Sequence, residues 1–337
     1  MPIRFPLAAI TLAALALFSV PGKAFPRSTD SVGKWVPATD SIALVTSTGT
    51  LAGTLELPSK EGRFPVALII SGSGPTDRNG NPPAALGSPN NALELLAEGL
   101  AARGVASVRF DKRGVGGSRA AATEGESALR FDTYVTDAVS WIRKLRADPR
   151  FTSVSVIGHS EGALIAMLAA RKVPIDGVVS VEGAGRRAAQ LLRDQLTMRM
   201  PALAQQADTF ITALSAGHTI DSVPAELRIL FRPSVQPYMI SWFKYDPAAE
   251  IAHLTVPVLI VQGTSDIQVP PAEAQLLTHA APKAKLLLIE GMNHVLKHVP
   301  SDDPTQVRAY TDATLPVEPT LLDGIAAFIR GIPAHTP

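Results

Sequence analysis

Short apolar runs alternate with amphipathic stretches along most of the chain. In each run successive residues are apolar, which is typical of strands buried on both faces of a sheet. In the stretches between the runs, apolar residues recur at helical spacing. The alternation predicts an α/β fold, with a mostly parallel, twisted sheet flanked by helices. The predicted strands are residues 66–70, 105–110, 153–157, 177–181, 256–261 and 285–289, and the predicted helices are residues 91–103, 128–147, 160–172, 271–281 and 321–330.

Two segments depart from this alternation. Residues 41–58 contain two apolar runs around Ser47-Thr48-Gly49 and predict a hairpin at the start of the sheet. Residues 186–252 contain no convincing core strand, and their first half has helical spacing of apolar residues. We therefore expect an inserted helical lid over the carboxyl edge of the sheet. The expected organisation is a first core part at 25–185, the lid at 186–252 and a second core part at 253–337.

The N-terminus has the pattern of a secretory signal. Arg4 precedes an apolar run at 7–20, and Gly22 and Ala24 stand at the −3 and −1 positions of a cut before Phe25. The run is shorter than the roughly 20 residues that cross a membrane. We expect a signal peptide at 1–24, cleaved from a periplasmic or secreted protein that has no membrane anchor. The alternatives are an uncleaved anchor and an N-terminal helix.

Composition excludes several classes of function. The 31 Lys and Arg residues nearly balance the 30 Asp and Glu residues, and no basic patch indicates a nucleic-acid partner. The chain has 0 cysteines, which excludes disulfides, thiolate metal sites and a cysteine nucleophile. Its 337 residues suffice for one large core with a smaller insertion.

The motif Gly158-His159-Ser160-Glu161-Gly162 lies between a predicted strand and a predicted helix. A serine on such a tight turn presents its hydroxyl at the edge of the sheet. The N–H of Glu161 then lies at a helix N-terminus, where it can face a developing oxyanion. The motif predicts that Ser160 is a nucleophile. The alternative is a glycine-rich turn whose serine only caps the helix.

A serine nucleophile needs a base, and the base needs an orienting carboxylate. In this architecture the acid and then the histidine follow the serine along the chain. Asp266 comes shortly after the strand at 256–261, and His294 comes shortly after the strand at 285–289. We predict a Ser160–Asp266–His294 triad. Glu290 is a reserve acid, and Asp266 could instead only cap the next helix.

The spacing of two histidines near the C-terminus could indicate a metal site. His298 is one helical turn beyond His294, and such a pair can hold a metal ion. No third ligand has a clear position, so we expect no metal. His159 neighbours the serine and is expected to shape the turn.

The loop at 71–81, Ser-Gly-Ser-Gly-Pro-Thr-Asp-Arg-Asn-Gly-Asn, is the place to expect a second oxyanion donor. Its small residues let the backbone approach a substrate closely. We predict that the N–H of Ser73 is the donor, with Gly72 as the alternative. The loop could also be a plain Gly/Pro connection.

The segment Asp-Lys-Arg-Gly-Val-Gly-Gly-Ser at 111–118 contains Gly-x-Gly, but Arg119 breaks the dinucleotide-binding fingerprint. No Walker loop is present either, so no nucleotide cofactor is expected. We expect Asp111 and Arg113 to form an ion pair, or a group that braces the loop beside the nucleophile strand.

These motifs, together with Asp266 and His294, resemble bacterial α/β-hydrolases of the carboxylesterase type, some of which are called serine aminopeptidase-like. The resemblance covers about residues 41–330 and is weakest in the lid. Relatives usually begin the oxyanion loop with His-Gly, whereas this chain has Ser71-Gly72. The resemblance implies an α/β-hydrolase fold and hydrolysis of small acyl esters without a cofactor.

Two other functions stay open. A peptidase or amidase would use the same triad and would need an acidic residue for a free amino terminus, for which Glu161 is the obvious candidate. A non-catalytic binding protein with this fold is the other alternative. Within the lid, a set of large apolar residues could line a substrate pocket or only pack the lid on the core: Met198, Met200, Phe210 and Trp242.

Overall fold

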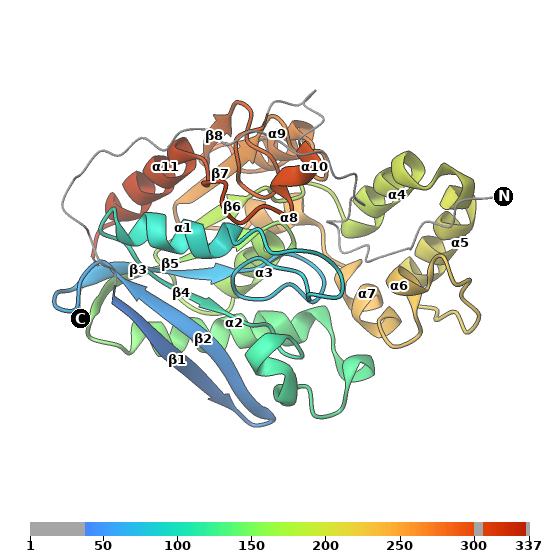
Figure 1. Ribbon diagram of the computed structural model, residues 1–337, viewed down its shortest axis with the longest axis horizontal. Coiled ribbons are helices and arrows are strands. Elements are labelled where there is room, and N and C mark those ends of the chain that lie inside the picture. The colour runs from blue at the N-terminus through green and yellow to red at the C-terminus, as the bar shows by residue number, and fades with distance from the viewer. Residues whose placement is uncertain (1–37, 300–305, 335–337) are drawn as a thin grey trace.

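A computed structural model describes residues 38–299 and 306–334, and one sheet of eight strands forms its centre (Figure 1). The strand order is β1-β2-β4-β3-β5-β6-β7-β8. The strands from β4 to β8 across the sheet pair in parallel, whereas β1 and β2 form an antiparallel hairpin that pairs antiparallel with β4. The predictions of the hairpin and of a mostly parallel sheet are confirmed. The strands are β1 (Ala38–Thr46), β2 (Gly49–Leu57), β3 (Phe64–Ile70), β4 (Ala106–Phe110), β5 (Phe151–His159), β6 (Gly177–Val181), β7 (Val258–Gly263) and β8 (Lys285–Ile289).

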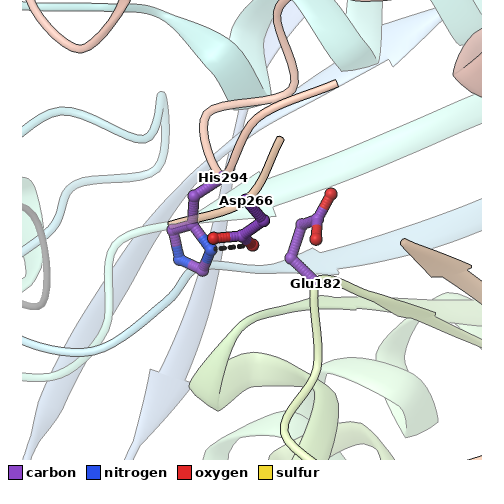
Figure 2. Close-up of side chains that lie close together, drawn as sticks. All are labelled: Glu182, Asp266 and His294. Atoms are coloured by element: carbon purple, nitrogen blue, oxygen red, sulfur yellow. Dashed lines mark hydrogen bonds and ion pairs between the residues drawn. The ribbon is translucent and has the colours of Figure 1, made fainter. Parts of the chain in front are cut away.

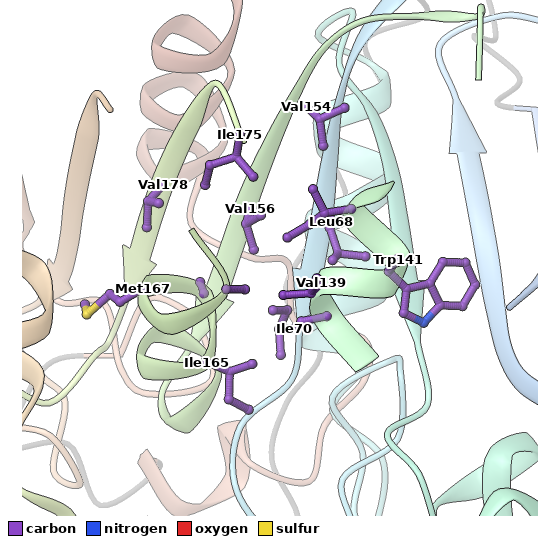
Figure 3. Close-up of a cluster of buried hydrophobic side chains, with 14 of the residues drawn as sticks. Leu68, Ile70, Val139, Trp141, Val154, Val156, Ile165, Met167, Ile175 and Val178 are labelled. Atoms are coloured by element: carbon purple, nitrogen blue, oxygen red, sulfur yellow. The ribbon is translucent and has the colours of Figure 1, made fainter. Parts of the chain in front are cut away.

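Helices cover both faces of the sheet, because the side chains of its central strands alternate between two apolar clusters. On β3, Leu68 and Ile70 belong to one cluster, and Ala67 and Ile69 belong to the other. The first cluster includes residues of α2 (Phe131–Arg146), α3 (Glu161–Ala170) and α9 (Pro271–Ala280). It is the cluster that Figure 3 draws. The second includes residues of α1 (Ala92–Ala101) and α11 (Pro319–Arg330).

The interval between β6 and β7 contains helices and loops but no strand, as predicted. These are α4 (Ala188–Arg199), α5 (Ala204–Ser215), α6 (Arg228–Phe231), α7 (Gln236–Trp242) and α8 (Pro247–Ala252). Helices α4 to α7 form a third apolar cluster of their own and lie together at one end of the molecule (Figure 1). Helix α8 differs from them, since it contacts α3 and α9 and buries Ile251 in the main core. That α4 to α7 act as a lid stays a prediction.

The remaining elements are short. They are the 3-10 turns at Gly116–Ala121, Glu126–Ala128 and Pro201–Leu203, and helix α10 (Gln306–Ala309). The predicted signal peptide at 1–24 lies outside the described residues. Within residues 38–299 and 306–334, no helix is both long enough and apolar enough to span a membrane.

The core makes a testable prediction about Leu68. Its side chain is 0% exposed in the centre of the sheet, so Leu68→Ala should lower the free energy of unfolding by about 2–5 kcal/mol. Leu286 is a matched control, because it is 42% exposed on the edge strand β8, and Leu286→Ala should change stability by only about 0.5 kcal/mol. Urea unfolding of both variants measures the difference, and equal losses would contradict this description of the core.

Candidate active site

Ser160 occupies a strained turn between β5 and α3. Its backbone has φ 55° and ψ −120°, a conformation that non-glycine residues rarely adopt. A Cβ on Gly158 would lie 2.1 Å from the carbonyl oxygen of Gly162, and a Cβ on Gly162 would lie 2.3 Å from that of Ile70. The two glycines of the motif are therefore required by close backbone approach. Ser160 makes no side-chain capping bond to α3, so helix capping does not explain this serine.

Asp266 and His294 meet at the edge of the sheet, from the loops that follow β7 and β8. Nδ1 of His294 lies 2.6 Å from Oδ2 of Asp266, and both residues are buried (Figure 2). The other oxygen of Asp266 accepts the N–H groups of Gln268 and Val269 at 2.7 and 2.9 Å. The carboxylate is thus held in place from one side while it orients the imidazole from the other.

His159 holds the backbone of His294 near the turn that carries the serine. Its imidazole lies 4.8 Å from that of His294, centroid to centroid, and its Nε2 lies 2.8 Å from the backbone oxygen of His294. A carbonyl oxygen only accepts, so Nε2 of His159 carries the proton. Burial, with His294 nearby, lowers the pKa of His159 to about 3, and the ring is therefore neutral. Within the described residues, no hydrogen bond joins Ser160 to His294. In enzymes without bound substrate, the hydrogen bond between nucleophile and base is often long or poorly aligned.

Glu182 is a buried acid that the sequence analysis missed. It directly follows β6, at φ 51°, and its carboxyl group accepts the N–H of Gly263 at 2.8 Å. Burial and the nearby charge of Asp266 raise the pKa of Glu182 well above its usual value. A hydrogen bond between Glu182 and Asp266 adds to this upward shift. Its place at the carboxyl end of a strand was the signal that could have revealed it.

The same hydrogen bond acts on Asp266. Burial opposes ionisation of Asp266, but the neighbouring His294 and the bonds from His294, Glu182 and Val269 together hold its pKa below the usual value. The surroundings thus shift the two pKa values in opposite directions, that of Asp266 downward and that of Glu182 upward. The alternative acid, Glu290, directly follows β8, is exposed and is not part of this cluster.

A metal ion would have to compete with these bonds. One ligand atom each of Glu182, Asp266 and His294 lie within 4.8 Å of one another, but hydrogen bonds already join all three side chains. His298, the other histidine considered for a metal, is 61% exposed and lies 3.3 Å from Glu318 instead. The arrangement fits an acid–base relay better than a metal centre.

Two backbone N–H groups are available beside Ser160. Gly72 adjoins the serine, since a Cβ on it would lie 3.2 Å from Cβ of Ser160. The N–H of Ser73, the next residue, and the N–H of Glu161 at the start of α3 donate to no group in the described part of the chain. Both predicted oxyanion donors thus belong to segments that flank the serine.

The expected ion pair between Asp111 and Arg113 is wrong. Asp111 instead binds the backbone and guanidinium N–H groups of Arg78, at 2.8 and 2.7 Å. Arg113 binds Asp137 on α2 at 2.6 Å. Consecutive side chains after β4 point in different directions, so each reaches a different neighbour. Asp111 braces the loop at 71–81, which bears out the other part of the expectation.

Glu161 is engaged by two partners. Its carboxylate lies 3.0 Å from Nζ of the buried Lys112 and accepts the hydroxyl of Tyr238 on α7 at 2.6 Å. Burial, with Glu161 nearby, raises the pKa of Tyr238 well above its usual value, so the phenol remains a donor. Neither Lys112 nor Tyr238 was singled out from the sequence. Lys112 lies within a recognised motif, whereas nothing in the sequence pointed to Tyr238.

A pocket opens beside Ser160, between α3 and the inserted helices. Its walls are mostly apolar, and about 550 Å³ of empty space, part of it open to solvent, lies within it. Trp242 lines the pocket, as one interpretation of the lid residues had it. Met198 is 75% exposed, and Met200 and Phe210 pack within the cluster of the inserted helices. The lining residues are Ser160, Glu161, Leu164, Ala184, Arg186, Ala188, Leu191, Leu192, Trp242, Pro247 and Val269.

Several known proteins resemble this chain in sequence or in fold. Esterase EstD of Thermotoga maritima is 25% identical over 250 residues, which are 73% of this chain and only 58% of that protein. The structure of Est1E from Butyrivibrio proteoclasticus with bound ferulic acid has a TM-score of 0.55 and 18% identity, over 86% of this chain and 99% of that one. A puromycin-hydrolyzing peptidase of Mycobacterium tuberculosis has the same TM-score, 0.55, and 18% identity, over 90% of this chain and 40% of that one.

The family model of the alpha/beta hydrolases matches residues 68–310, which run from β3 through the serine turn and the inserted helices to the histidine loop and beyond. This match covers well over half of the chain. The chain belongs to the alpha/beta hydrolase family.

Proposed function

We propose that this protein is a serine hydrolase that cleaves carboxylic esters through an acyl-enzyme intermediate. The observation that carries the proposal is the strained turn that presents Ser160 to the pocket, with the hydrogen-bonded His294 and Asp266 beside it. The 25% identity with esterase EstD supports the same class of reaction.

In the first half of the reaction, the hydroxyl oxygen of Ser160 attacks the ester carbonyl carbon. Nε2 of His294 takes the hydroxyl proton, and Asp266 stabilises the resulting imidazolium through Nδ1. The carbonyl oxygen becomes an oxyanion that accepts the N–H groups of Ser73 and Glu161. Each such donor is worth about 10²–10³ in rate in known hydrolases. The tetrahedral intermediate then collapses, and His294 returns the proton to the departing alcohol.

In the second half, His294 takes a proton from water as the water attacks the acyl-enzyme. Collapse of this second intermediate releases the carboxylic acid, and the proton returns to Ser160. Glu182 supports both halves, because its raised pKa favours the neutral acid, which adds no second negative charge beside the imidazolium.

The pocket favours an uncharged, apolar acyl group. Only Glu161 and Arg186 among its lining residues are charged, and both are already paired. Lys112 and Tyr238 hold Glu161, and Arg186 binds Glu273 at 2.7 Å and Asp194 at 2.8 Å. A free amino terminus would thus find no unpaired carboxylate here, which weakens the peptidase alternative.

The first test combines variants with a substrate panel. Ser160→Ala and His294→Ala should lower kcat on p-nitrophenyl esters by about 10⁵–10⁶-fold, whereas Asp266→Asn should cost about 10²–10⁴-fold. The asparagine variant loses less because Glu182 lies within 4.8 Å of His294 and can replace the lost partner.

Controls separate loss of chemistry from loss of fold. Circular dichroism and melting of each variant should match the wild type, and Glu290→Gln should retain full activity. An active Ser160→Ala protein would refute the triad, and faster cleavage of aminoacyl anilides than of esters would favour the peptidase.

A second prediction concerns the pocket wall. Trp242 lines the pocket and stacks on Phe131 at 5.8 Å, so Trp242→Ala should shift the preferred acyl chain of p-nitrophenyl esters toward longer chains. Met200 is the matched control within the same insertion, because it packs among the inserted helices and away from the pocket. Met200→Ala should lower the melting temperature and leave the acyl-chain profile unchanged; identical profiles for the wild type and Trp242→Ala would contradict a role for the insertion in choosing the substrate.

We also propose export to the periplasm or the medium, because Arg4, the apolar run at 7–20 and the small residues Gly22 and Ala24 form the pattern of a signal peptide. Mature protein should begin near Phe25. N-terminal sequencing of protein recovered from cell fractions measures this. A cytoplasmic product that begins at Met1 or Pro2 would end the proposal.

A further inference from the structure

Lys112 is buried beside the serine turn, where its charge needs partners. Its side chain is 2% exposed, and Nζ donates to the backbone oxygen of Gly72 at 2.5 Å and to Oε1 of Glu161 at 3.0 Å. The ammonium also lies 5.2 Å from the centre of the Tyr134 ring. These partners come from the loop after β3, from the start of α3 and from α2, so one side chain joins three elements.

Two of these partners, Gly72 and Glu161, are directly connected to the N–H groups that we assign to the oxyanion hole. The oxygen of Gly72 and the N–H of Ser73 are the two ends of one peptide unit. A trans peptide is planar, with its C=O and N–H pointing in opposite directions. When Lys112 holds the oxygen on one side, the N–H of Ser73 must therefore point to the other. A flip of this peptide would break its bond to a buried cation.

Lys112 also strengthens this donor. A charged donor on a carbonyl oxygen polarises the whole peptide unit and makes its N–H a better donor in turn. The second contact, with the carboxylate of Glu161, ties down the first residue of α3. That residue carries the other N–H assigned to the oxyanion, and Tyr238 donates to the other oxygen of its carboxylate.

We infer that Lys112 is a positioning residue for the oxyanion hole, which aims the N–H groups of Ser73 and Glu161 at the same point beside Ser160. This inference rests on the proposed function, because an oxyanion forms only if Ser160 attacks a carbonyl group. Lys112 touches no substrate and acts through Gly72 and Glu161. It adds to the triad a cation that organises the site in the transition state.

The test compares two variants with a matched control. Lys112→Met removes the ammonium, and Lys112→Met with Glu161→Gln also removes the carboxylate that would otherwise be buried without its partner. The control is Arg113→Met with Asp137→Asn, which removes the neighbouring buried ion pair. Neither of its residues bonds to Gly72 or Glu161.

Two measurements separate positioning from stability. The first is kcat and KM on p-nitrophenyl butyrate. The second is inhibition by an alkyl trifluoromethyl ketone, which forms a tetrahedral oxyanion adduct with a reactive serine, compared with the corresponding trifluoromethyl alcohol, which does not. Both Lys112 variants should lose about 10–10²-fold in kcat, with KM changed less than about threefold. The ketone should bind more weakly by the same factor, and the alcohol should bind as before.

The control double variant should melt at a lower temperature and keep the wild-type kcat and ketone affinity. If Lys112→Met does not fold, the double variant at Lys112 and Glu161 decides. Wild-type kcat and ketone affinity in that double variant, or an equal loss of both in the control, would overturn the inference while the esterase proposal stands. A wild-type protein that neither cleaves the ester nor binds the ketone would instead contradict the proposed function, and the inference with it.

Discussion

The strained backbone of Ser160 is the constraint on which the rest of the site depends. A residue at φ 55° and ψ −120° persists only where surrounding contacts hold it. Here the glycines on both sides let β5, α3 and the loop after β3 approach one another closely, and the N–H of Ser160 bonds to Val181 of β6 at 2.9 Å. The central parallel strands thus provide the rigid support that keeps one hydroxyl at the mouth of a pocket.

Two separate networks of buried, paired polar groups lie near that hydroxyl. On one side lie Glu182, Asp266 and His294, where the pKa of the outer acid is raised and that of the inner acid is lowered. On the other side Lys112 and Tyr238 hold Glu161. A buried charge without a partner is costly, so the packing that buries these groups also fixes their positions. In the proposed mechanism, one network holds the base and the other holds the oxyanion donors.

The inserted helices contribute side chains to the site. Tyr238 on α7 bonds to Glu161, and Trp242 on the same helix lines the pocket and stacks on Phe131 of the core. At the start of the insertion, Glu273 on α9 accepts the N–H of Gly185 and binds Arg186. These contacts anchor the insertion at both of its ends. A shift of the insertion would therefore disturb Glu161, the residue that follows the serine.

The sequence by itself determined the order of strands and helices, the serine turn, and the acid and histidine that the structure brings together. These features are local, because apolar periodicity sets each element and parallel strands end at one edge of the sheet. Only the tertiary structure decided the partners of the buried charges. Asp111 pairs with Arg78 rather than Arg113, Glu182 bonds to Asp266, and Tyr238 reaches Glu161. Such pairs join residues far apart in the chain, and which side chains meet is decided by packing across the fold, which no local pattern records.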